Sequence, residues 1–98
     1  MINISAKAKK FATSLDFYVE AGKMEVEQAG ATVDIDTIEI SEENSDLLVI
    51  YELLESGHAG LHLSPEYVEG LPEVITNTRQ LTKTVEHIIN NYGDRCKD

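Results

Sequence analysis

The stretch KMEVEQAGATVDIDTIEI, residues 23–40, alternates apolar and mostly acidic side chains, and this alternation decides the fold class. Apolar residues at every second position predict two β-strands, over residues 23–27 and 33–36. The intervening residues 28–31 include a glycine and predict the loop of a β-hairpin. The centre of the chain is therefore expected to form an antiparallel sheet.

The alternation changes parity within this stretch. Ile35 occupies an odd-numbered position, whereas Ile38 and Ile40 occupy even-numbered ones. Successive side chains of a strand point to opposite faces, so an uninterrupted strand would separate Ile35 from Ile38. A β-bulge near residues 36–37 would return these side chains to one face, and we expect such a bulge.

A second pair of strands is expected after an acidic, turn-rich loop at residues 42–46. The apolar run Leu47–Leu54 predicts a buried strand, paired through residues 56–60 with a strand at Leu61–Leu63. A helix over the apolar run remains the alternative, because short apolar runs do not distinguish the two. Residues 64–70 are typical of a short helical turn that ends at a glycine.

The C-terminal part has helical periodicity. Apolar residues recur at three- and four-residue spacing, which predicts a helix over about residues 72–92. Pro72 suits its first turn, Glu73 suits the positive end of its dipole, and Gly93 is expected as its C-terminal cap. The apolar stripe of this helix needs a sheet or another helix to cover it.

The N-terminal third fits two patterns. Apolar residues alternate from Phe11 to Ala21, as in a strand, yet much of the same segment also forms a helical stripe. The β-favouring residues 17–19 and a turn expected at residues 21–23 favour a strand over about residues 15–20. A short helix or an extended lysine-rich segment is expected before it.

These elements predict one α+β domain over residues 1–98, with an antiparallel sheet of three to five strands packed against a long C-terminal helix. An apolar fraction of 42% is enough for a modest core. The sequence has no long apolar run of the signal-peptide or transmembrane kind, and the one cysteine, Cys96, has no intrachain partner. A reducing, cytoplasmic location is therefore expected.

The chain is strongly acidic, and the acidity is local. The formal net charge is −10, and residues 24–78 hold thirteen carboxylates without a single lysine or arginine. Like charges packed together cost stability through self-repulsion. Such a surface repels nucleic acid and anionic membranes, and it attracts basic partners.

The expected hairpin arranges some of these acids as a ladder. With a loop at residues 28–31, Glu25 faces Asp34, and Glu25 lies about 6.6 Å from Glu27 at a rise of roughly 3.3 Å per residue. A nucleic-acid backbone also presents evenly spaced negative charges. The candidate partner-binding residues are Glu25, Glu27, Asp34, Asp36, Glu39, Glu42, Glu43 and Asp46, with Glu66, Glu69 and Glu73 as a second cluster.

Other uses of the acids and histidines lack the required residues. Residues 34–36 begin like a calcium loop, but the glycine and the bidentate glutamate of such a loop are missing. His58 and His62 have the spacing of a helical zinc pair, yet nearby glycines argue against a helix, and in a strand the two would lie about 13 Å apart. Nucleophile motifs and phosphate-binding glycine loops are missing from the sequence, so no enzyme activity, metal or cofactor is expected.

The run Phe17-Tyr18-Val19-Glu20-Ala21-Gly22 resembles a segment of small, acidic, phage-encoded anti-CRISPR proteins that block type I-F surveillance complexes. The resemblance covers these six residues and implies a compact α+β domain. It further implies a non-enzymatic inhibitor that imitates DNA and competes with it for the Lys/Arg-lined channel of a CRISPR effector. Within the run, Glu20 is the candidate contact.

Two classes of function follow. In the first, the chain is an inhibitor whose acidic surface binds a basic, nucleic-acid-binding protein such as a CRISPR effector, through carboxylates that pair with Arg and Lys and speed association. In the second, it is a small acidic adaptor, or a dimeric protein resembling a secretion chaperone, that binds through an apolar surface. A plainer reading is a domain whose acidity only keeps it dispersed.

Overall fold

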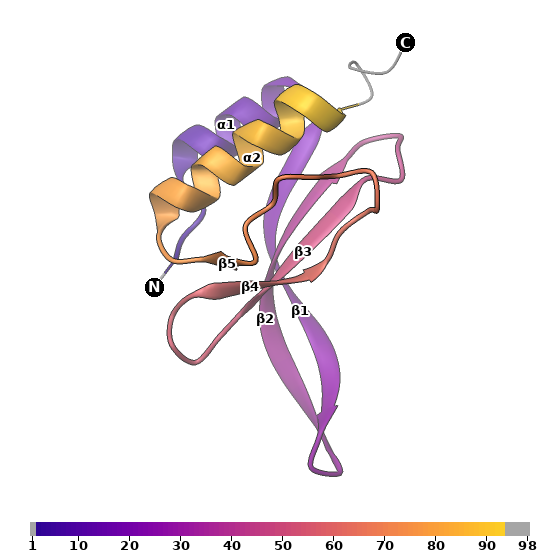
Figure 1. Cartoon of the computed structure of the whole chain (residues 1–98), viewed down its shortest axis with the longest axis vertical. Helices are drawn as coiled ribbons and strands as arrows, with labels where there is room; N and C mark the ends of the chain where they lie inside the picture. The colour runs from indigo at the N-terminus through magenta and orange to yellow at the C-terminus, as the bar shows by residue number, and fades with distance from the viewer. Residues whose placement is uncertain (1, 94–98) are drawn as a thin grey trace.

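The computed structural model describes residues 2–93 and contains five strands between two helices (Figure 1). Helix α1 spans Ala6–Ser14 and helix α2 spans Thr78–Tyr92. The strands are β1 (Phe17–Gln28), β2 (Ala31–Glu42), β3 (Leu48–Leu53), β4 (Ala59–Leu63) and β5 (Val74–Ile75). Cys96 lies outside the described residues. Neither of the two helices described is long and apolar enough to cross a membrane.

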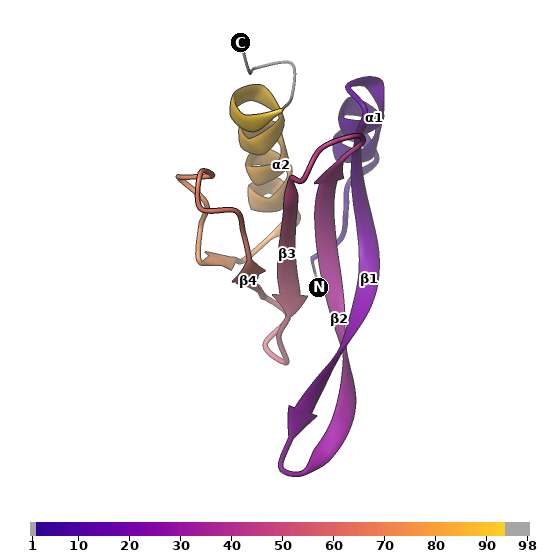
Figure 2. The ribbon, with the colours of Figure 1, turned by 90° about the vertical axis from the view of Figure 1, so that its right-hand side faces the viewer.

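The strands form one antiparallel sheet in the order β1-β2-β3-β4-β5, so each strand pairs with its neighbour in the chain. Helices α1 and α2 pack against each other and lie over one face of this sheet (Figures 1 and 2). The expected α+β class, the antiparallel sheet and the C-terminal helix are therefore confirmed.

The core lies between the helices and the part of the sheet that they cover. Its side chains are almost completely buried: Leu81, Val85, Ile88 and Ile89 from α2, and Phe17, Val19, Ile38, Ile40, Val49 and Tyr51 from the sheet. The Tyr51 hydroxyl donates a 2.8 Å hydrogen bond to the Pro72 carbonyl oxygen. This bond satisfies the one polar atom of the side chain inside the core.

The C-terminal helix is shorter than expected. It begins at Thr78 rather than near Pro72, because Val74–Ile75 form β5 and pair with β4. The isoleucine of β5 is fully buried, and the side chain of Asn77 caps the helix. Gly93 is the C-cap residue, as expected. The apolar residues that extended the helical pattern toward Pro72 therefore belong to a strand.

The N-terminal third contains a helix and a strand in succession. The short helix expected before the strand is α1, and the Ser5 hydroxyl caps it by accepting from the Ala8 backbone N–H at 3.1 Å. The turn expected at residues 21–23 is wrong, because β1 continues without interruption from Phe17 to Gln28. At Gly22 the missing Cβ leaves room for the carboxylate of Glu39.

The middle of the chain follows the expected pairing, with two differences in the connections. β3 and β4 pair as antiparallel strands, so the helical alternative for the apolar run is wrong. Residues 64–70 form no helix, and the Val68 N–H instead closes a single turn with the Pro65 carbonyl oxygen at 3.1 Å. The hairpin loop has two residues, Ala29-Gly30, both with positive φ, which is the geometry of a type I′ turn.

The bulge expected near residues 36–37 is wrong. The β1–β2 register is continuous from the pair Phe17–Glu42 to the pair Gln28–Ala31. The apolar residues instead change faces along β2, so that Ile38 points into the core and Ile35 points to the opposite side. The physical reason is that the helices cover only the part of the hairpin that is remote from its turn, so apolar side chains face the helices only there. The part of the hairpin near the turn extends beyond the helices (Figure 2).

Candidate protein-binding surface on the hairpin arm

The distal parts of β1 and β2, residues 23–36, form an arm that projects from the body of the molecule (Figures 1 and 2). The molecule is accordingly elongated, with principal extents of 46 × 24 × 21 Å. β3 pairs with β2 only over residues 37–41, so no third strand accompanies the arm within residues 2–93. A two-stranded hairpin is marginally stable by itself in water, so the arm depends on the body for its register.

One face of the arm carries four of the predicted carboxylates, and we call it the acidic face: Glu25, Glu27, Asp34 and Asp36. The register sets Glu25 opposite Asp34, as predicted, and Lys23 opposite Asp36. All four carboxylates are exposed. In the described chain none of them forms a salt bridge with a lysine or arginine. The acidic face is therefore left largely uncompensated.

The acidic face continues the core face of the same strands. Phe17 and Val19 occupy odd-numbered positions of β1, as Glu25 does, so all three point to the same local side. The side chains on this side change from buried and apolar to exposed and charged where the cover of the helices ends. The acids therefore occupy a side of the hairpin that the helices leave uncovered.

The opposite side of the arm carries four apolar residues, and we call it the apolar face: Met24, Val26, Val33 and Ile35. The register pairs Met24 with Ile35 and Val26 with Val33. Val33 is 36% exposed and the other three are half-buried. Sequence reasoning missed this face. The signal for it was the change of parity between Ile35 and Ile38, which the expected bulge would have removed.

The other predicted residues lie elsewhere, so the structure does not bring all eleven together. Glu43 and Asp46 are exposed in the β2–β3 loop, at the end of β2 opposite to the arm. Glu39 is half-buried on the other side of β2, where it accepts a 3.2 Å hydrogen bond from the Thr37 hydroxyl. Glu42 is only 8% exposed, which removes it from the predicted surface.

The second predicted cluster lies in the loop between β4 and β5, where Glu66, Glu69 and Glu73 are exposed. This loop is attached to α2, because the Glu69 N–H donates to the Tyr92 hydroxyl at 3.0 Å. It lies apart from the arm (Figure 1). Glu20, the candidate contact of the resembling run, is exposed and pairs with Glu39 on the side opposite the acidic face.

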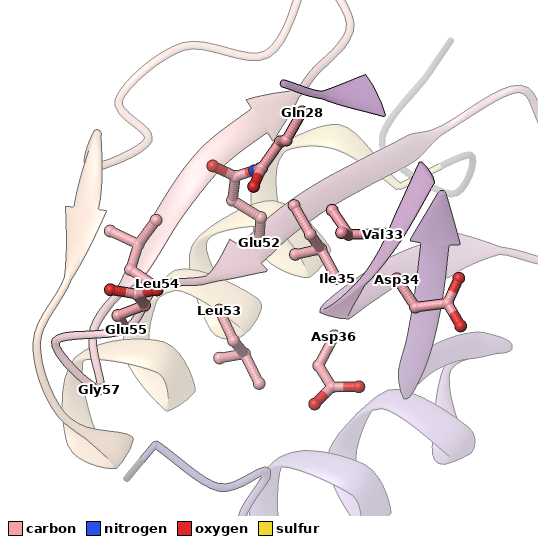
Figure 3. Close-up of a pocket in the computed structure, with 10 residues that line it drawn as sticks. All are labelled: Gln28, Val33, Asp34, Ile35, Asp36, Glu52, Leu53, Leu54, Glu55 and Gly57. Carbon is pink, nitrogen blue, oxygen red and sulfur yellow. The ribbon is translucent and has the colours of Figure 1, made fainter. Parts of the chain in front are cut away.

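A groove of about 510 Å³ lies beside the arm, between β2 and the turn that joins β3 to β4 (Figure 3). Its β2 wall consists of Val33, Asp34, Ile35 and Asp36. Its other wall consists of Glu52, Leu53, Leu54 and Glu55. The groove therefore combines apolar side chains with carboxylates, and all of its charged residues are acidic.

Nearby charge and burial shift the pKa of two tyrosines. The carboxylate of Glu43 raises the pKa of Tyr18, and burial raises the pKa of Tyr51 to about 12. His62 Nδ1 lies 3.8 Å from Glu52 Oε2, beside the groove. Over residues 2–93 the side chains of His, Cys, Asp and Glu form no group of three or more that could hold a metal ion.

Compared with known proteins, the chain matches no protein-family model, no curated protein and no solved structure. The function of the arm is therefore inferred from its own residues and geometry.

Proposed function

We propose that the chain is a non-enzymatic inhibitor that binds a basic, nucleic-acid-binding protein through the acidic face and so excludes nucleic acid from that protein. A CRISPR effector complex in the cytoplasm is the partner that the resemblance of residues 17–22 implies. The observation that carries the proposal is the arm itself, which projects four exposed carboxylates in two columns of defined register.

The spacing of the charges supports this proposal. The acidic face extends over about 13 Å from Glu27 to Asp36, since a strand rises roughly 3.3 Å per residue. Four carboxylates over that length correspond to one charge per about 3.3 Å, and a single nucleic-acid strand carries one charge per about 3.4 Å of duplex axis. Lys23 lies on the same face, opposite Asp36, and reduces the net charge there to −3, or one charge per about 4.4 Å. The arm therefore approaches, without reaching, the charge density of one strand.

The cost of these charges to the free protein also supports a role in binding. Glu25 and Asp34 face each other across the strand pair, and like charges in this position are destabilising. Lysines and arginines of a partner would relieve the repulsion and steer the encounter of the two proteins. A partner of opposite charge therefore explains an arrangement that the fold alone disfavours.

Competition with DNA tests the proposal. A type I-F surveillance complex bound to labelled target DNA is titrated with the wild-type chain, which should displace the DNA with an affinity that falls steeply between about 50 and 200 mM salt. Glu25→Lys/Asp34→Lys should abolish the displacement. Glu66→Lys/Glu69→Lys reverses two charges in the loop between β4 and β5 and should retain most of it. The proposal fails if the arm variant displaces DNA as well as the wild type does.

The apolar face favours a second candidate, an adaptor or a protein resembling a secretion chaperone. Val33 and Leu54 are 36% and 38% exposed, and both line the groove. Exposed apolar surface of this kind is typical of protein–protein contacts. In this case Val33→Asp would abolish partner binding, whereas Glu25→Lys/Asp34→Lys would not, and the affinity would depend little on salt.

A further inference from the structure

The edge of β2 that faces β3 is unpaired over residues 31–36. β3 pairs with β2 over residues 37–41, and the chain turns away after Leu53. Hydrogen bonds from Leu54 N to His58 O at 2.8 Å and from Gly57 N to Leu54 O at 3.0 Å close this turn. Backbone groups alternate in direction along a strand, so every second residue of the unpaired stretch directs its N–H and C=O into the gap.

The groove described above occupies this gap. Successive side chains of β2 alternate, so Val33 and Ile35 line one side of the edge, and Asp34 and Asp36 line the other. Figure 3 shows Val33 and Ile35 next to each other, and the carboxylate of Asp34 directed away from them. The gap therefore offers free backbone groups, an apolar side and an acidic side at the same place.

We propose that this edge binds an extended segment of a partner protein in which apolar and basic residues alternate, and adds it to the sheet as a strand beside β2. Main-chain hydrogen bonds supply affinity in this mode, and alternate side chains supply specificity. The apolar residues of the segment contact Val33 and Ile35. Its lysines or arginines pair directly with Asp34 and diagonally with Asp36, because cross-strand neighbours on one face lie about 4.5–5.5 Å apart and diagonal neighbours about 7–8 Å apart.

The inference rests on the proposed function, because it takes the partner to be cationic. It adds that an extended segment of the partner is the part that binds the arm. The segment need only be short. Four residues opposite residues 32–35 supply two apolar and two basic side chains, over a length of about 13 Å, and the basic side chain opposite Asp34 reaches Asp36 along the diagonal.

Charge selects this occupant over a second copy of the chain. Any antiparallel register that sets Val33 and Ile35 of two copies on one face also sets their Asp34 and Asp36 on the other face. Like charges directly opposite each other destabilise a strand pair. Glu52 and Glu55 on the far wall of the groove make the gap still less favourable for an acidic strand.

Binding of a synthetic peptide to the full chain tests this inference. The probe is a fluorescently labelled peptide of sequence TVKVKVKT, and its control is TVVVKKKT, which has the same composition without the alternation. The alternating peptide should bind at least about tenfold more tightly. It should shift the amide resonances of residues 31–36 and protect alternate amides among them from hydrogen exchange. A version of the probe with methylated backbone nitrogens should lose binding, because it cannot donate to the edge.

Two matched variants distinguish pairing at the edge of β2 from general electrostatic attraction by the acidic face. Asp34→Lys/Asp36→Lys should weaken peptide binding at least about tenfold, since two attractive cross-strand pairs become repulsive. Glu25→Lys/Glu27→Lys reverses the same number of charges on β1, which is not adjacent to the gap, and should weaken binding about twofold.

Three results would overturn the inference: equal binding of the two peptides, resonance shifts confined to residues outside 31–36, or equal weakening by the two variants. Equal weakening would still support the proposed function, because only the total charge of the acidic face would then matter. Conversely, peptide binding at residues 31–36 supports the inference even if Glu25→Lys/Asp34→Lys still displaces DNA, a result that rejects the proposed function. The methylated peptide needs no protein variant, so misfolding of a variant does not leave the inference untested.

Discussion

Replacing Asp34 with lysine should stabilise the free protein. Asp34 faces Glu25 in the β1–β2 register, so the change converts a repulsive cross-strand pair into an attractive one. A charge pair in this position contributes roughly 0.2–1 kcal/mol with either sign, so the two effects together amount to about 0.4–2 kcal/mol. The change also moves the net charge two units toward zero from −10, which reduces self-repulsion.

Urea denaturation followed by circular dichroism measures this effect. With a slope of about 1–3 kcal/mol/M, a gain of about 1 kcal/mol moves the midpoint upward by about 0.3–1 M. Glu66→Lys is the matched control, because it makes the same change in net charge at an exposed loop position outside the hairpin. Its midpoint should rise less than that of Asp34→Lys.

The reasoning is refuted if Asp34→Lys stabilises the protein no more than Glu66→Lys does. A second background identifies the cause: with Glu25→Gln in place, the advantage of Asp34→Lys over Glu66→Lys should shrink toward zero. High salt should reduce that advantage in the same way, since both charges of the pair are exposed. If Asp34→Lys stabilises the protein but no longer displaces DNA from the partner, the acidic face serves binding at a cost in stability.

Three further predictions concern the core, the pH dependence and a helix cap. Ile38→Ala should lower the free energy of unfolding, measured in urea, by about 2–5 kcal/mol, since Ile38 is 2% exposed. Ile35→Ala should lower it by less than about 1 kcal/mol. Equal losses in the two variants would contradict the uninterrupted register. Above pH 10 the free energy of unfolding should fall by up to about 3 kcal/mol, because burial raises the pKa of Tyr51 from 10.0 to about 12 and the unfolded chain therefore loses its proton first. A pH titration of Tyr51→Phe should lack this loss, and an unchanged slope would exclude Tyr51 as its origin. Asn77→Ala should lower the free energy of unfolding by about 1 kcal/mol through the loss of the 2.8 Å bond from the Gln80 N–H to its side chain; an unchanged thermal midpoint would show that the cap contributes nothing.

The register of the hairpin could be predicted from local signals. The alternation on both sides of residues 28–31, with a glycine between them, placed Glu25 opposite Asp34. In the structure the loop has only two residues, Ala29-Gly30. The same residues still face each other, because the expected and the observed loop are both centred between residues 29 and 30. Turn chemistry and strand period act over a few residues, so a single sequence contains them.

The start of α2 could not be predicted in this way. Val74 and Ile75 have helical spacing relative to the residues that follow, yet they pair with Gly60 and Ala59 in β4. A two-residue strand has no period of its own, and its partner lies well before it in the chain. Only the buried contact of Ile75 decides between helix and strand, and that contact exists only in the assembled core.

Some features of the candidate site also follow from the local sequence, and others follow only from the tertiary structure. The sequence by itself determined the chemistry of the arm: carboxylates at every second position and apolar residues between them. The tertiary structure decided which side of the strands meets the core. β1 has 12 residues and extends over about 40 Å, whereas α2 has 15 residues and extends over about 22 Å. The helices therefore cover only part of the hairpin. The change of parity between Ile35 and Ile38 is compatible both with partial cover by the helices and with a bulge. Only the packing of the helices on the sheet distinguishes these two explanations.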